Sequence, residues 1–460
     1  MVELRLSEVA RKIDGTILQG SPSLAFSKFN IDSRLTEPGE LFIALVANRN
    51  GHDFVPHAVK KGAAGAIISQ KISLPEKNIA LIQVKDTLEA LNKLAKKVLC
   101  DYKIKVVGIT GSIGKTTTKE FSYSLLSSTF KVLKSEGNFN NQLGLPLSLL
   151  RLNNTHEVAV LEMAMSAPGE IRALTQTAPP DVAVITNISP VHLQFFKSIE
   201  EIGKAKKEIL EGMKMGGTAV LNGDDPRIKK IARDWKGKKI IFGLSSECDI
   251  RARNIQKIGF KGMLFEIIYG QRKGEILFPF FYEGFLYNFL AASAAAYVLS
   301  VPFEDIHGQI KNLKPFPRRG IFFPLKRNIK LIDDSYNSNP RALEEALKGL
   351  AELPSKRKIA VLGDMLELGE KEVEFHIQAG KHVAKWGWDC LVTVGSLSMH
   401  MAEGALSSGI KTNQIFSFKN SEEAAEKIWT LIRDGDLILV KGSRKIETEK
   451  IVEKLKSKGP

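Results

Sequence analysis

The stretch Val106-Val107-Gly108-Ile109-Thr110-Gly111-Ser112-Ile113-Gly114-Lys115-Thr116-Thr117-Thr118 decides the fold. An apolar run leads into a glycine-rich turn, and a helix-forming segment follows. Such a turn lets successive backbone N–H groups point at phosphate oxygens, and the positive N-terminal end of the helix adds to the attraction. We therefore predict a phosphate-binding loop between a buried strand and a helix.

Two side chains of this loop have predicted roles. Lys115 is expected to reach the β- and γ-phosphates of a nucleotide, and Thr116 is expected to contact Mg²⁺. The usual pattern has a glycine where Ile109 stands, and the glycines here fall at 108, 111 and 114. A helix N-terminus without a ligand is the alternative, but three glycines in register after a buried strand favour a nucleotide.

Length and composition indicate a large soluble protein. At 460 residues the chain exceeds one ordinary core and predicts two to four domains. No apolar run approaches the roughly 20 residues that span a bilayer, and the N-terminus lacks the apolar segment of a signal peptide. We expect a cytoplasmic protein without membrane insertion. Cys100, Cys248 and Cys390 have neither metal-ligand spacing nor the density of a disulfide framework.

The net charge of +15 does not by itself indicate a nucleic-acid partner. The Lys and Arg residues are spread along the chain, with no basic tail and no patch interleaved with aromatic residues. Attraction of polyanionic small molecules such as nucleotides is an adequate use of the charge, and a solvated lysine-rich surface is the alternative.

The order of apolar runs predicts three α/β domains. Residues 1–98 form a small α/β domain, residues 99–312 a P-loop domain with a mostly parallel sheet, and residues 313–460 a Rossmann-like domain. An amphipathic helix over 87–102 links the first domain to the second. Strands of the last two domains are expected at 105–110, 157–163, 182–187, 329–332, 358–362, 390–394 and 436–440.

Polar residues follow the predicted strands of the central domain. Because ligands bind at the carboxyl ends of parallel strands, Lys115, Glu162, Asn187 and His192 are expected to converge on one crevice. A carboxylate facing the P-loop threonine would hold Mg²⁺, which prefers oxygen ligands. A surface charge at a strand end is the alternative for Glu162, and an ordinary loop histidine is the alternative for His192. In the helix predicted at 198–210, the lysines are expected on a solvated face.

Segments that follow predicted strands in the two outer domains are also candidates for ligand binding. Asp333–Pro340 and Lys441–Arg444 lie where an α/β domain binds ligands, although turn formation alone would explain the Asp, Asn and Pro of the first. In the first domain, Ser33 and Arg34 offer a hydroxyl and a guanidinium fork for a diphosphate. A turn with a surface ion pair between Asp32 and Arg34 is the alternative.

Together these motifs resemble the Mur ligases of bacterial cell-wall synthesis, over all three predicted domains. Within that family the resemblance is to the branch that adds D-alanyl-D-alanine. The branch that adds diaminopimelate or lysine is expected to have the sequence Asp-Asn-Pro-Arg in its last domain, and this chain does not contain it. The motifs that carry the resemblance are Asp32-Ser33-Arg34 with Gly51–Phe54, Thr110–Thr117, Asn138–Pro146, Glu162–Met165 with Pro168–Ile171, Asp333–Pro340, Gly363–Gly369 and Val440–Arg444.

The resemblance implies an ATP-dependent ligase that joins D-alanyl-D-alanine to UDP-N-acetylmuramoyl-tripeptide through an acyl phosphate. It implies that the N-terminal domain binds the UDP substrate and that the C-terminal domain binds the dipeptide and closes on ATP. The oligomeric state stays open, and a monomer is the default expectation. The site residues that the resemblance implies are Lys115, Glu162, His192, Lys206 and Arg319 for catalysis, Gly111, Ser112, Gly114, Lys115, Thr116, Thr117, Asn288, Arg319, Asp334 and Asn337 for ATP, and Ser33 and Arg34 for the UDP substrate.

The resemblance further implies two Mg²⁺ ions. Thr116 and Glu162 would hold the first, and His192 with a carbamylated Lys206 would hold the second, because carbamylation turns an ammonium into an anionic oxygen ligand. Lys204 and Lys207 are the alternatives to Lys206. Arg318 stands where the family has a glycine before Arg319.

Two other functions stay open at this stage. Folylpolyglutamate synthase shares the P-loop and the lysine, but its chain is not expected to carry a uridine-nucleotide domain over residues 1–98. A nucleotide-switched binding or assembly protein would bind ATP without any ligase activity, and a P-loop with a net positive charge would suffice for it.

Overall fold

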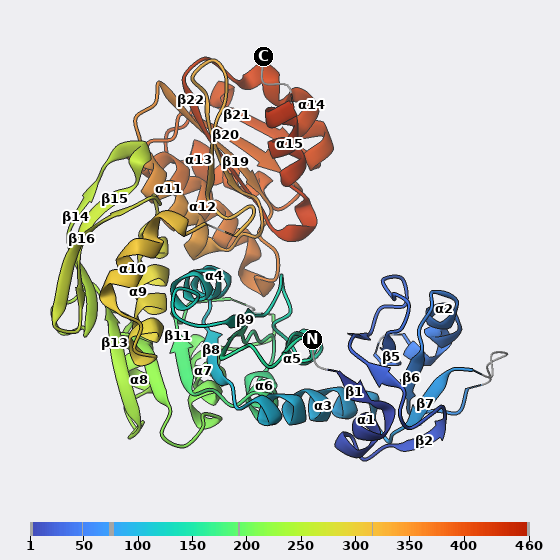
Figure 1. Cartoon of the computed structure of the whole chain (residues 1–460). Helices are drawn as coiled ribbons and strands as arrows, with labels where there is room; N and C mark the ends of the chain where they lie inside the picture. Colours follow the sequence, from blue (N-terminus) through green and yellow to red (C-terminus); the bar gives the residue numbers. More distant parts are fainter. Residues whose placement is uncertain (1–2, 48, 73–77, 192–193, 315, 458–460) are drawn as a thin grey trace.

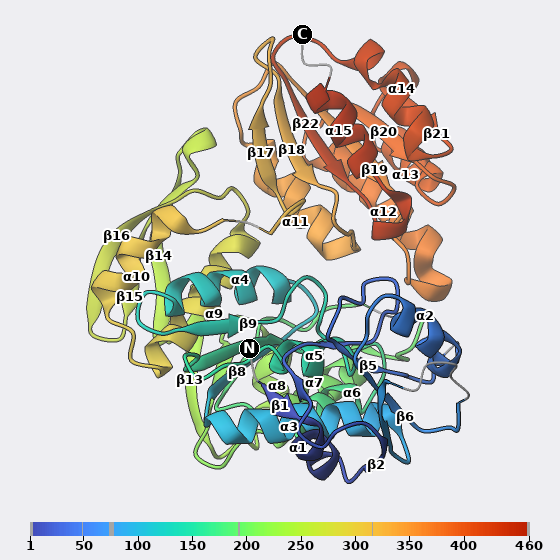
Figure 2. The ribbon, with the colours of Figure 1, turned by 45° about the vertical axis from the view of Figure 1, so that its right-hand side comes forward.

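The structure is a computed structural model that describes residues 3–47, 49–72, 78–191, 194–314 and 316–457. The chain forms three α/β domains, as the sequence predicts, each around its own main sheet (Figure 1). The C-terminal domain lies over the central domain in both views, and in Figure 1 the N-terminal domain lies to one side (Figures 1 and 2).

The long helix α3 (Thr87–Tyr102) joins the first domain to the second. Asp86 begins it, because its carboxylate accepts hydrogen bonds from the backbone N–H groups of Leu88 and Glu89. Its apolar face, which includes Leu91 and Leu94, belongs to one core cluster with residues of both domains. The boundary predicted after residue 98 falls inside this helix, which therefore packs as part of both domains.

The N-terminal domain has a five-stranded sheet in the order β2-β7-β6-β5-β4. Only β2 runs antiparallel to its neighbour, and a short pair, β1 with β3, stands beside the sheet. The elements are β1 (Leu4–Arg5), α1 (Leu6–Lys12), β2 (Thr16–Gln19), β3 (Ala25–Phe26), β4 (Phe29–Asn30), β5 (Leu41–Ile43), α2 (Val55–Lys60), β6 (Gly65–Ile68) and β7 (Ala80–Gln83).

The central domain has a nine-stranded sheet in the order β16-β15-β14-β13-β12-β11-β8-β10-β9, parallel from β9 to β14. The sequence analysis did not identify β9, β12 and β13, nor β14, β15 and β16, and the sheet becomes antiparallel from the pairing of β14 with β15 onward. The elements are β8 (Lys105–Thr110), α4 (Lys115–Leu126), β9 (Val132–Lys134), α5 (Gly144–Leu149), β10 (Val158–Glu162), α6 (Glu170–Thr177), β11 (Val182–Ile185), α7 (Ile199–Glu211), β12 (Thr218–Asn222), α8 (Pro226–Ile231), β13 (Lys238–Gly243), β14 (Ile250–Lys257), β15 (Met263–Tyr269), β16 (Arg272–Phe278), α9 (Glu283–Val298) and α10 (Phe303–Gln309).

Helices cover both faces of the central sheet, which explains why its strands read as continuous apolar runs. Val107 and Ile109 of β8 face the cluster that contains Phe121 of α4 and Phe289 of α9. Val106 of the same strand faces the opposite cluster, which includes residues of α3, α5, α6 and α7. The alternation along β8 is that of a strand buried on two sides.

The C-terminal domain has a six-stranded sheet in the order β17-β18-β22-β19-β20-β21, in which only β17 is antiparallel. Four of these strands lie within two residues of their predicted ends, and the edge strands β17 and β21 were not predicted. The elements are β17 (Ile321–Pro324), β18 (Lys330–Asp334), α11 (Pro340–Ala351), β19 (Arg357–Gly363), α12 (Glu372–Lys385), β20 (Cys390–Val394), α13 (Met399–Leu406), β21 (Ile415–Phe418), α14 (Ser421–Leu431), β22 (Asp436–Lys441) and α15 (Glu449–Ser457).

Apolar packing joins the central and C-terminal domains near the start of α9. Phe281 and Tyr282 belong to the same core cluster as Leu347 and Leu350 of α11. The two domains are therefore held together by this apolar packing as well as by the short loop before β17. Across the described part of the chain, no helix combines the length and apolarity that a bilayer crossing requires.

Candidate functional site

The glycine-rich loop lies between β8 and α4, and the loop that follows β11 fixes its shape. Asn187 accepts hydrogen bonds from the N–H groups of Ser112 (3.0 Å, to its carbonyl) and Ile113 (3.0 Å, to Oδ1). Its Nδ2 donates to the carbonyl of Ile113 at 2.9 Å, and Thr186 Oγ1 donates to the same carbonyl at 2.6 Å. These bonds leave the N–H groups at the start of α4 to face a ligand, because the first turn of a helix has no intrahelical acceptor for them.

Glycine is required at position 114 for two reasons. Its φ of +85° is in the left-handed region, and a Cβ there would lie 2.1 Å from Oδ1 of Asn288 on α9. Asn288 is buried, and its Oδ1 also accepts a hydrogen bond from Thr118 Oγ1 at 3.3 Å. The loop and α9 therefore approach each other closely where the sequence predicted a nucleotide.

We expect Gly114→Ala to destabilise the protein more than Gly169→Ala. Gly169 also begins a helix, with a φ of +87°, but a Cβ there meets nothing within 4 Å. The control change should therefore cost only the backbone strain of about 1–2 kcal/mol, and Gly114→Ala should add an overpacking cost of about 1–3 kcal/mol. Melting temperatures with and without ATP measure both effects, and ATP protection should be lost only in Gly114→Ala. Equal melting temperatures in the two variants would contradict the close approach of Asn288.

Lys115 lies folded over its own loop. Its Nζ donates to the carbonyl of Gly111 at 2.9 Å and contacts the carbonyl of Ser112 at 3.4 Å. Burial lowers the pKa of the Lys115 ammonium; the Glu162 carboxylate opposes this shift and the Arg319 guanidinium adds to it. A phosphate would give this ammonium the anionic partner that the loop carbonyls do not supply.

Glu162 ends β10 opposite the P-loop, as the sequence predicts, and both of its carboxylate oxygens are engaged. Thr116 Oγ1 donates to Oε2 at 2.9 Å, and Asn140 Nδ2 donates to Oε1 at 2.9 Å. The backbone N–H of Glu162 donates to Ser135 Oγ at 3.2 Å. Glu162 is buried, so the alternative of a surface charge is wrong.

The oxygen donors at this point fit a small hard cation. The hydroxyl of Thr116 and the carboxylate of Glu162 touch each other, and Mg²⁺ is commonly bound by one or two carboxylates together with phosphates and waters. Within the described ranges, no group of three or more His, Cys, Asp or Glu side chains is arranged to hold a metal ion. A cation here would therefore need ligands from a nucleotide as well.

Lys206 is buried on α7, with 2% of its surface exposed, although Lys204 on the same helix is exposed. The sequence-based expectation that the lysines of this helix form a solvated face is wrong for Lys206. Residues two apart on a helix lie on different faces, so Lys206 lies on the buried side while Lys204 lies on the exposed side. Burial, and next the positive charge of Lys115, hold the pKa of Lys206 well below its usual range. No described residue forms a hydrogen bond or an ion pair with it, and His192, its predicted companion, lies outside the described residues.

Arg319 lies in the linker that precedes the C-terminal sheet, close enough to Lys115 of the P-loop for its charge to lower the pKa of that ammonium. Its guanidinium lies 4.3 Å from the centre of the Tyr336 ring, and its Nε is buried without a hydrogen-bond partner among the described residues. Arg318 before it has a φ of +64°, which explains why a glycine is expected at that position. The Arg318 side chain pairs with Glu449 of α15 at 2.6 Å.

The two strand-end segments singled out in the C-terminal domain meet each other. Lys441 Nζ donates to Asp334 Oδ2 at 2.6 Å and to the carbonyl of Asn337 at 3.0 Å, and both partners of the ion pair are buried. Asn337 is exposed beside this pair. Asn339 accepts a hydrogen bond from the N–H of Ala342, so part of the segment does serve to begin α11.

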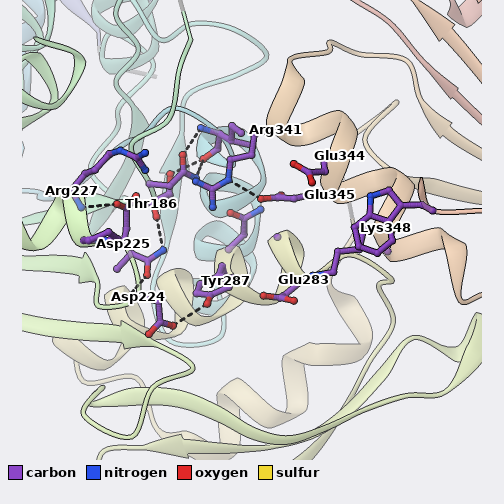
Figure 3. Close-up of a pocket in the computed structure, with 18 of the residues that line it drawn as sticks. Thr186, Asp224, Asp225, Arg227, Glu283, Tyr287, Arg341, Glu344, Glu345 and Lys348 are labelled. Carbon is purple, nitrogen blue, oxygen red and sulfur yellow. Dashed lines mark hydrogen bonds and ion pairs between the residues drawn. The ribbon is translucent and has the colours of Figure 1, made fainter. Parts of the chain in front are cut away.

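A cavity of about 630 Å³ opens between the central and C-terminal domains beside the P-loop. Ile113, Asn187 and Asn288 line it from the central domain. Figure 3 shows Tyr287 and Glu283 of α9 facing Arg341 and Glu345 of α11 across it. Tyr287 donates to Asp224 at 2.9 Å (Figure 3). The size and position of the cavity suit the base and ribose of a nucleotide whose phosphates lie on the loop.

The residues predicted for a UDP substrate lie in the N-terminal domain, away from this cavity. Ser33 is buried, with its Oγ 3.0 Å from His57 Nδ1. The Arg34 side chain is 82% exposed, and its guanidinium forms a two-pronged pair with Asp32, at 2.9 and 2.6 Å. Here the structure shows the turn with a surface ion pair that was the alternative for this segment.

Two residues of the site were not predicted as such. Asn140 lies in the stretch 138–146 that carried the resemblance, and only the fold brings it to Glu162. Thr186 directly precedes Asn187, and its contact with Ile113 depends on the pairing of β8 with β11. Thr186 lies at the end of the predicted strand 182–187, a sequence signal that could have found it, whereas Asn140 follows β9, a strand that was not predicted.

Comparison with known proteins agrees with this geometry. Residues 109–296 match the Mur ligase middle domain, and residues 318–444 match the Mur ligase, glutamate ligase domain. The UDP-N-acetylmuramoyl-tripeptide–D-alanyl-D-alanine ligase of Bacillus subtilis (strain 168) is 33% identical over 461 residues, which cover 99% of each chain. This chain belongs to the Mur ligase family. The enzyme of the same name from Escherichia coli (strain K12) is 32% identical over 100% of both chains.

Solved Mur ligases share the whole architecture. A crystal structure of MurF from Acinetobacter baumannii superposes with a TM-score of 0.91 at 30% identity and covers 100% of both chains. The MurF ligase of Thermotoga maritima in complex with ADP gives a TM-score of 0.81 at 31% identity over 94% of this chain and 97% of that one. A folylpolyglutamate synthase of Mycobacterium tuberculosis gives 0.63 at 14% identity, which shows a common fold only.

Proposed function

We propose that this chain is the ATP-dependent ligase that joins D-alanyl-D-alanine to UDP-N-acetylmuramoyl-tripeptide in peptidoglycan precursor synthesis. The products are UDP-N-acetylmuramoyl-pentapeptide, ADP and phosphate. The observation that carries the proposal is the grouping of Lys115, Glu162 and Arg319 at the edge of the central sheet, because two cations beside a carboxylate suit the binding of nucleotide phosphates together with a cation. The full-length similarity to ligases of this name supports the choice of substrates.

The reaction is proposed to proceed in two displacements. A carboxylate oxygen of the tripeptide attacks the γ-phosphorus, the bond from that phosphorus to the bridging oxygen of ADP breaks, and an acyl phosphate forms. The amine of D-alanyl-D-alanine then attacks the acyl carbon, and the tetrahedral intermediate expels phosphate as the nitrogen loses a proton. The chain itself needs no covalent intermediate, so its task is positioning and charge stabilisation.

Lys115 and Arg319 are assigned to the transferred phosphoryl group. Lys115 would exchange its bonds to the carbonyls of Gly111 and Ser112 for phosphate oxygens, and the unpartnered Nε of Arg319 would donate from the other side. The N–H groups at Gly114, Lys115, Thr116 and Thr117 would hold the β-phosphate. Asn288, Asp334 and Asn337 are proposed to contact the rest of the nucleotide, with Lys441 fixing the position of Asp334.

Thr116 and Glu162 are proposed to hold one Mg²⁺, with Asn140 orienting the carboxylate. Lys206, in carbamylated form, and His192 are proposed to hold a second. When bound, such cations neutralise charge on the phosphates and the developing acyl phosphate. The burial of Lys206, which has no hydrogen-bond or ion-pair partner among the described residues, supports this assignment, because a neutral amine is the form that reacts with carbon dioxide.

The remaining assignments concern the two outer domains, the oligomeric state and the cellular compartment. Ser33 and Arg34 are proposed to bind the UDP diphosphate, with Arg34 leaving Asp32, and the C-terminal domain is proposed to bind the dipeptide. We further propose that the protein acts as a monomer in the cytoplasm, where ATP is available; its three cysteines are all free.

Phosphate release from ATP and Mg²⁺ tests the proposal. With a UDP-N-acetylmuramoyl-tripeptide that ends in diaminopimelate or lysine, release should depend on D-alanyl-D-alanine, and mass analysis should show the pentapeptide. Glutamylation of a folate would instead indicate the folylpolyglutamate synthase activity. ATP binding without turnover of either tripeptide would indicate a nucleotide-switched binding protein.

A further inference from the structure

Lys119 is a buried lysine to which the proposed mechanism gives no role. It lies one helical turn after Lys115 on α4, and none of its surface is exposed. Burying an ammonium is costly unless hydrogen bonds and an opposite charge surround it, so such a residue needs a reason for its position. Its contacts connect three segments that are far apart in the sequence.

The first contact is with the loop that follows β9. Lys119 Nζ donates to the carbonyl of Ser135 at 2.7 Å and approaches the carbonyl of Gly137 at 3.4 Å. The hydroxyl of Ser135 accepts the backbone N–H of Glu162, and three residues beyond Gly137 the side chain of Asn140 donates to the Glu162 carboxylate. Lys119 therefore anchors the loop that orients Glu162 from two directions.

The second contact is with the linker to the C-terminal domain. The ammonium lies 5.8 Å from the centre of the Phe316 ring, within the range of a cation–π interaction. Phe316 meets Tyr336 edge to face at 5.4 Å, and the Arg319 guanidinium covers the other ring at 4.3 Å. A continuous series of contacts thus runs from Lys119 through Phe316 and Tyr336 to Arg319.

The counter-charge of Lys119 is shared. Glu120 Oε1 lies 3.2 Å from its Nζ, and the other carboxylate oxygen of Glu120 pairs with Lys134. Lys134 contacts the ring of Tyr123 at 4.3 Å and has no hydrogen bond to the carbonyls of Ser135 or Gly137. Lys134 therefore serves as a matched control, because it pairs with the same Glu120 carboxylate but contacts neither the loop around Ser135 through its ammonium nor the Phe316 ring.

We infer that Lys119 is a positioning residue that couples the loop around Glu162 to the placement of Arg319. Its ammonium holds the Ser135–Asn140 loop on one side and seats the Phe316 ring on the other, so that the carboxylate and the guanidinium are set relative to the same fixed charge. The kinetic test of this inference rests on the proposed ligase function, whereas the binding test does not.

The test compares Lys119→Met, Phe316→Leu, the double variant and Lys134→Met. Because small misplacements of reacting groups cost up to about 100-fold in rate, Lys119→Met should lower kcat by about 10- to 100-fold, while KM for the UDP-tripeptide changes by less than about threefold. Phe316→Leu should lower kcat less, and the double variant should resemble Lys119→Met because both act through one series of contacts. Lys134→Met should behave as wild type.

A binding measurement separates positioning from a general structural role. By calorimetry, Mg²⁺ should strengthen ATP binding less in Lys119→Met than in wild type, and ATP binding without Mg²⁺ should be unchanged. Phe316→Leu should keep the full Mg²⁺ effect, because its ring lies on the Arg319 side. This variant also keeps the test decisive if Lys119→Met does not fold.

The outcomes are distinguishable from failure of the proposed function. If the wild type binds Mg²⁺ and ATP but ligates nothing, the ligase proposal fails and the calorimetric comparison still decides the role of Lys119. Equal Mg²⁺ effects in wild type and Lys119→Met, or independent kcat losses that multiply in the double variant, would overturn the inference.

Discussion

Replacement of Lys115 by methionine is expected to abolish ligation almost completely, with kcat reduced by about 1,000-fold or more. The methylene chain keeps its packing, but the transferred phosphoryl group loses the ammonium that now rests on the carbonyls of Gly111 and Ser112. Phosphate release under saturating substrates measures the loss. The melting temperature should not fall, because burial of this ammonium is unfavourable, as the lowered pKa of Lys115 indicates.

The control for this experiment is Lys134→Met, which removes a lysine from the neighbouring strand β9 that forms no contact with the P-loop. It should retain wild-type kcat. ATP should still bind to Lys115→Met, with reduced affinity, because the N–H groups of α4 are unchanged. If Lys115→Met kept more than about a tenth of wild-type kcat, the proposed electrostatic role of Lys115 would be wrong.

Replacement of Lys206 by alanine is expected to reduce kcat by about 100-fold or more, because the proposed second Mg²⁺ would lose an oxygen ligand. Acetate or propionate should restore part of the activity, since a small carboxylate fits the space that the side chain leaves and supplies the missing anionic oxygen. Activity against acid concentration, with sodium chloride at equal ionic strength as the comparison, measures this rescue.

Lys204→Ala is the matched control, because Lys204 lies on the same helix and is exposed. It should retain wild-type activity and gain nothing from the acid. Full activity of Lys206→Ala would exclude the carbamate assignment. Loss of activity in Lys204→Ala with rescue by acetate would transfer the assignment to that residue, which the sequence left as an alternative.

The strongly patterned parts of the fold could be predicted from the sequence. The P-loop with its flanking strand and helix, the helix over 87–102 and the strand over 390–394 were predicted at or near their observed ends, because apolar period and turn chemistry are local properties. Strands β9, β12 and β13 were not predicted. The strands β14 to β16, among which the pairing becomes antiparallel, were missed as well. They carry charged and apolar residues without the buried run of a parallel strand, and their pairing depends on partners elsewhere in the chain.

The sequence was a poorer guide to which way a side chain points and to which residue it pairs with. The lysines of α7 look alike in sequence, and only packing against the central sheet decides that Lys206 is inside and Lys204 outside. In the same way, Arg34 pairs with its neighbour Asp32 in this structure, whereas Asp334 finds Lys441, 107 residues away. Local pairs can be read from spacing, but distant ones require the fold.

The sequence by itself predicted a nucleotide-binding P-loop, a position for Glu162 at the end of a neighbouring strand, and a resemblance to Mur ligases over the whole chain. Glycine spacing, apolar runs and short motifs suffice for these conclusions because they reflect local backbone requirements. Only the tertiary structure decided that Asn140 orients Glu162, that Lys206 is buried, and that Lys119 lies between the Glu162 loop and the Arg319 linker. The physical reason is that burial, and the electrostatics that follow from it, depend on which segments pack together, and the strand order of the sheets sets that packing.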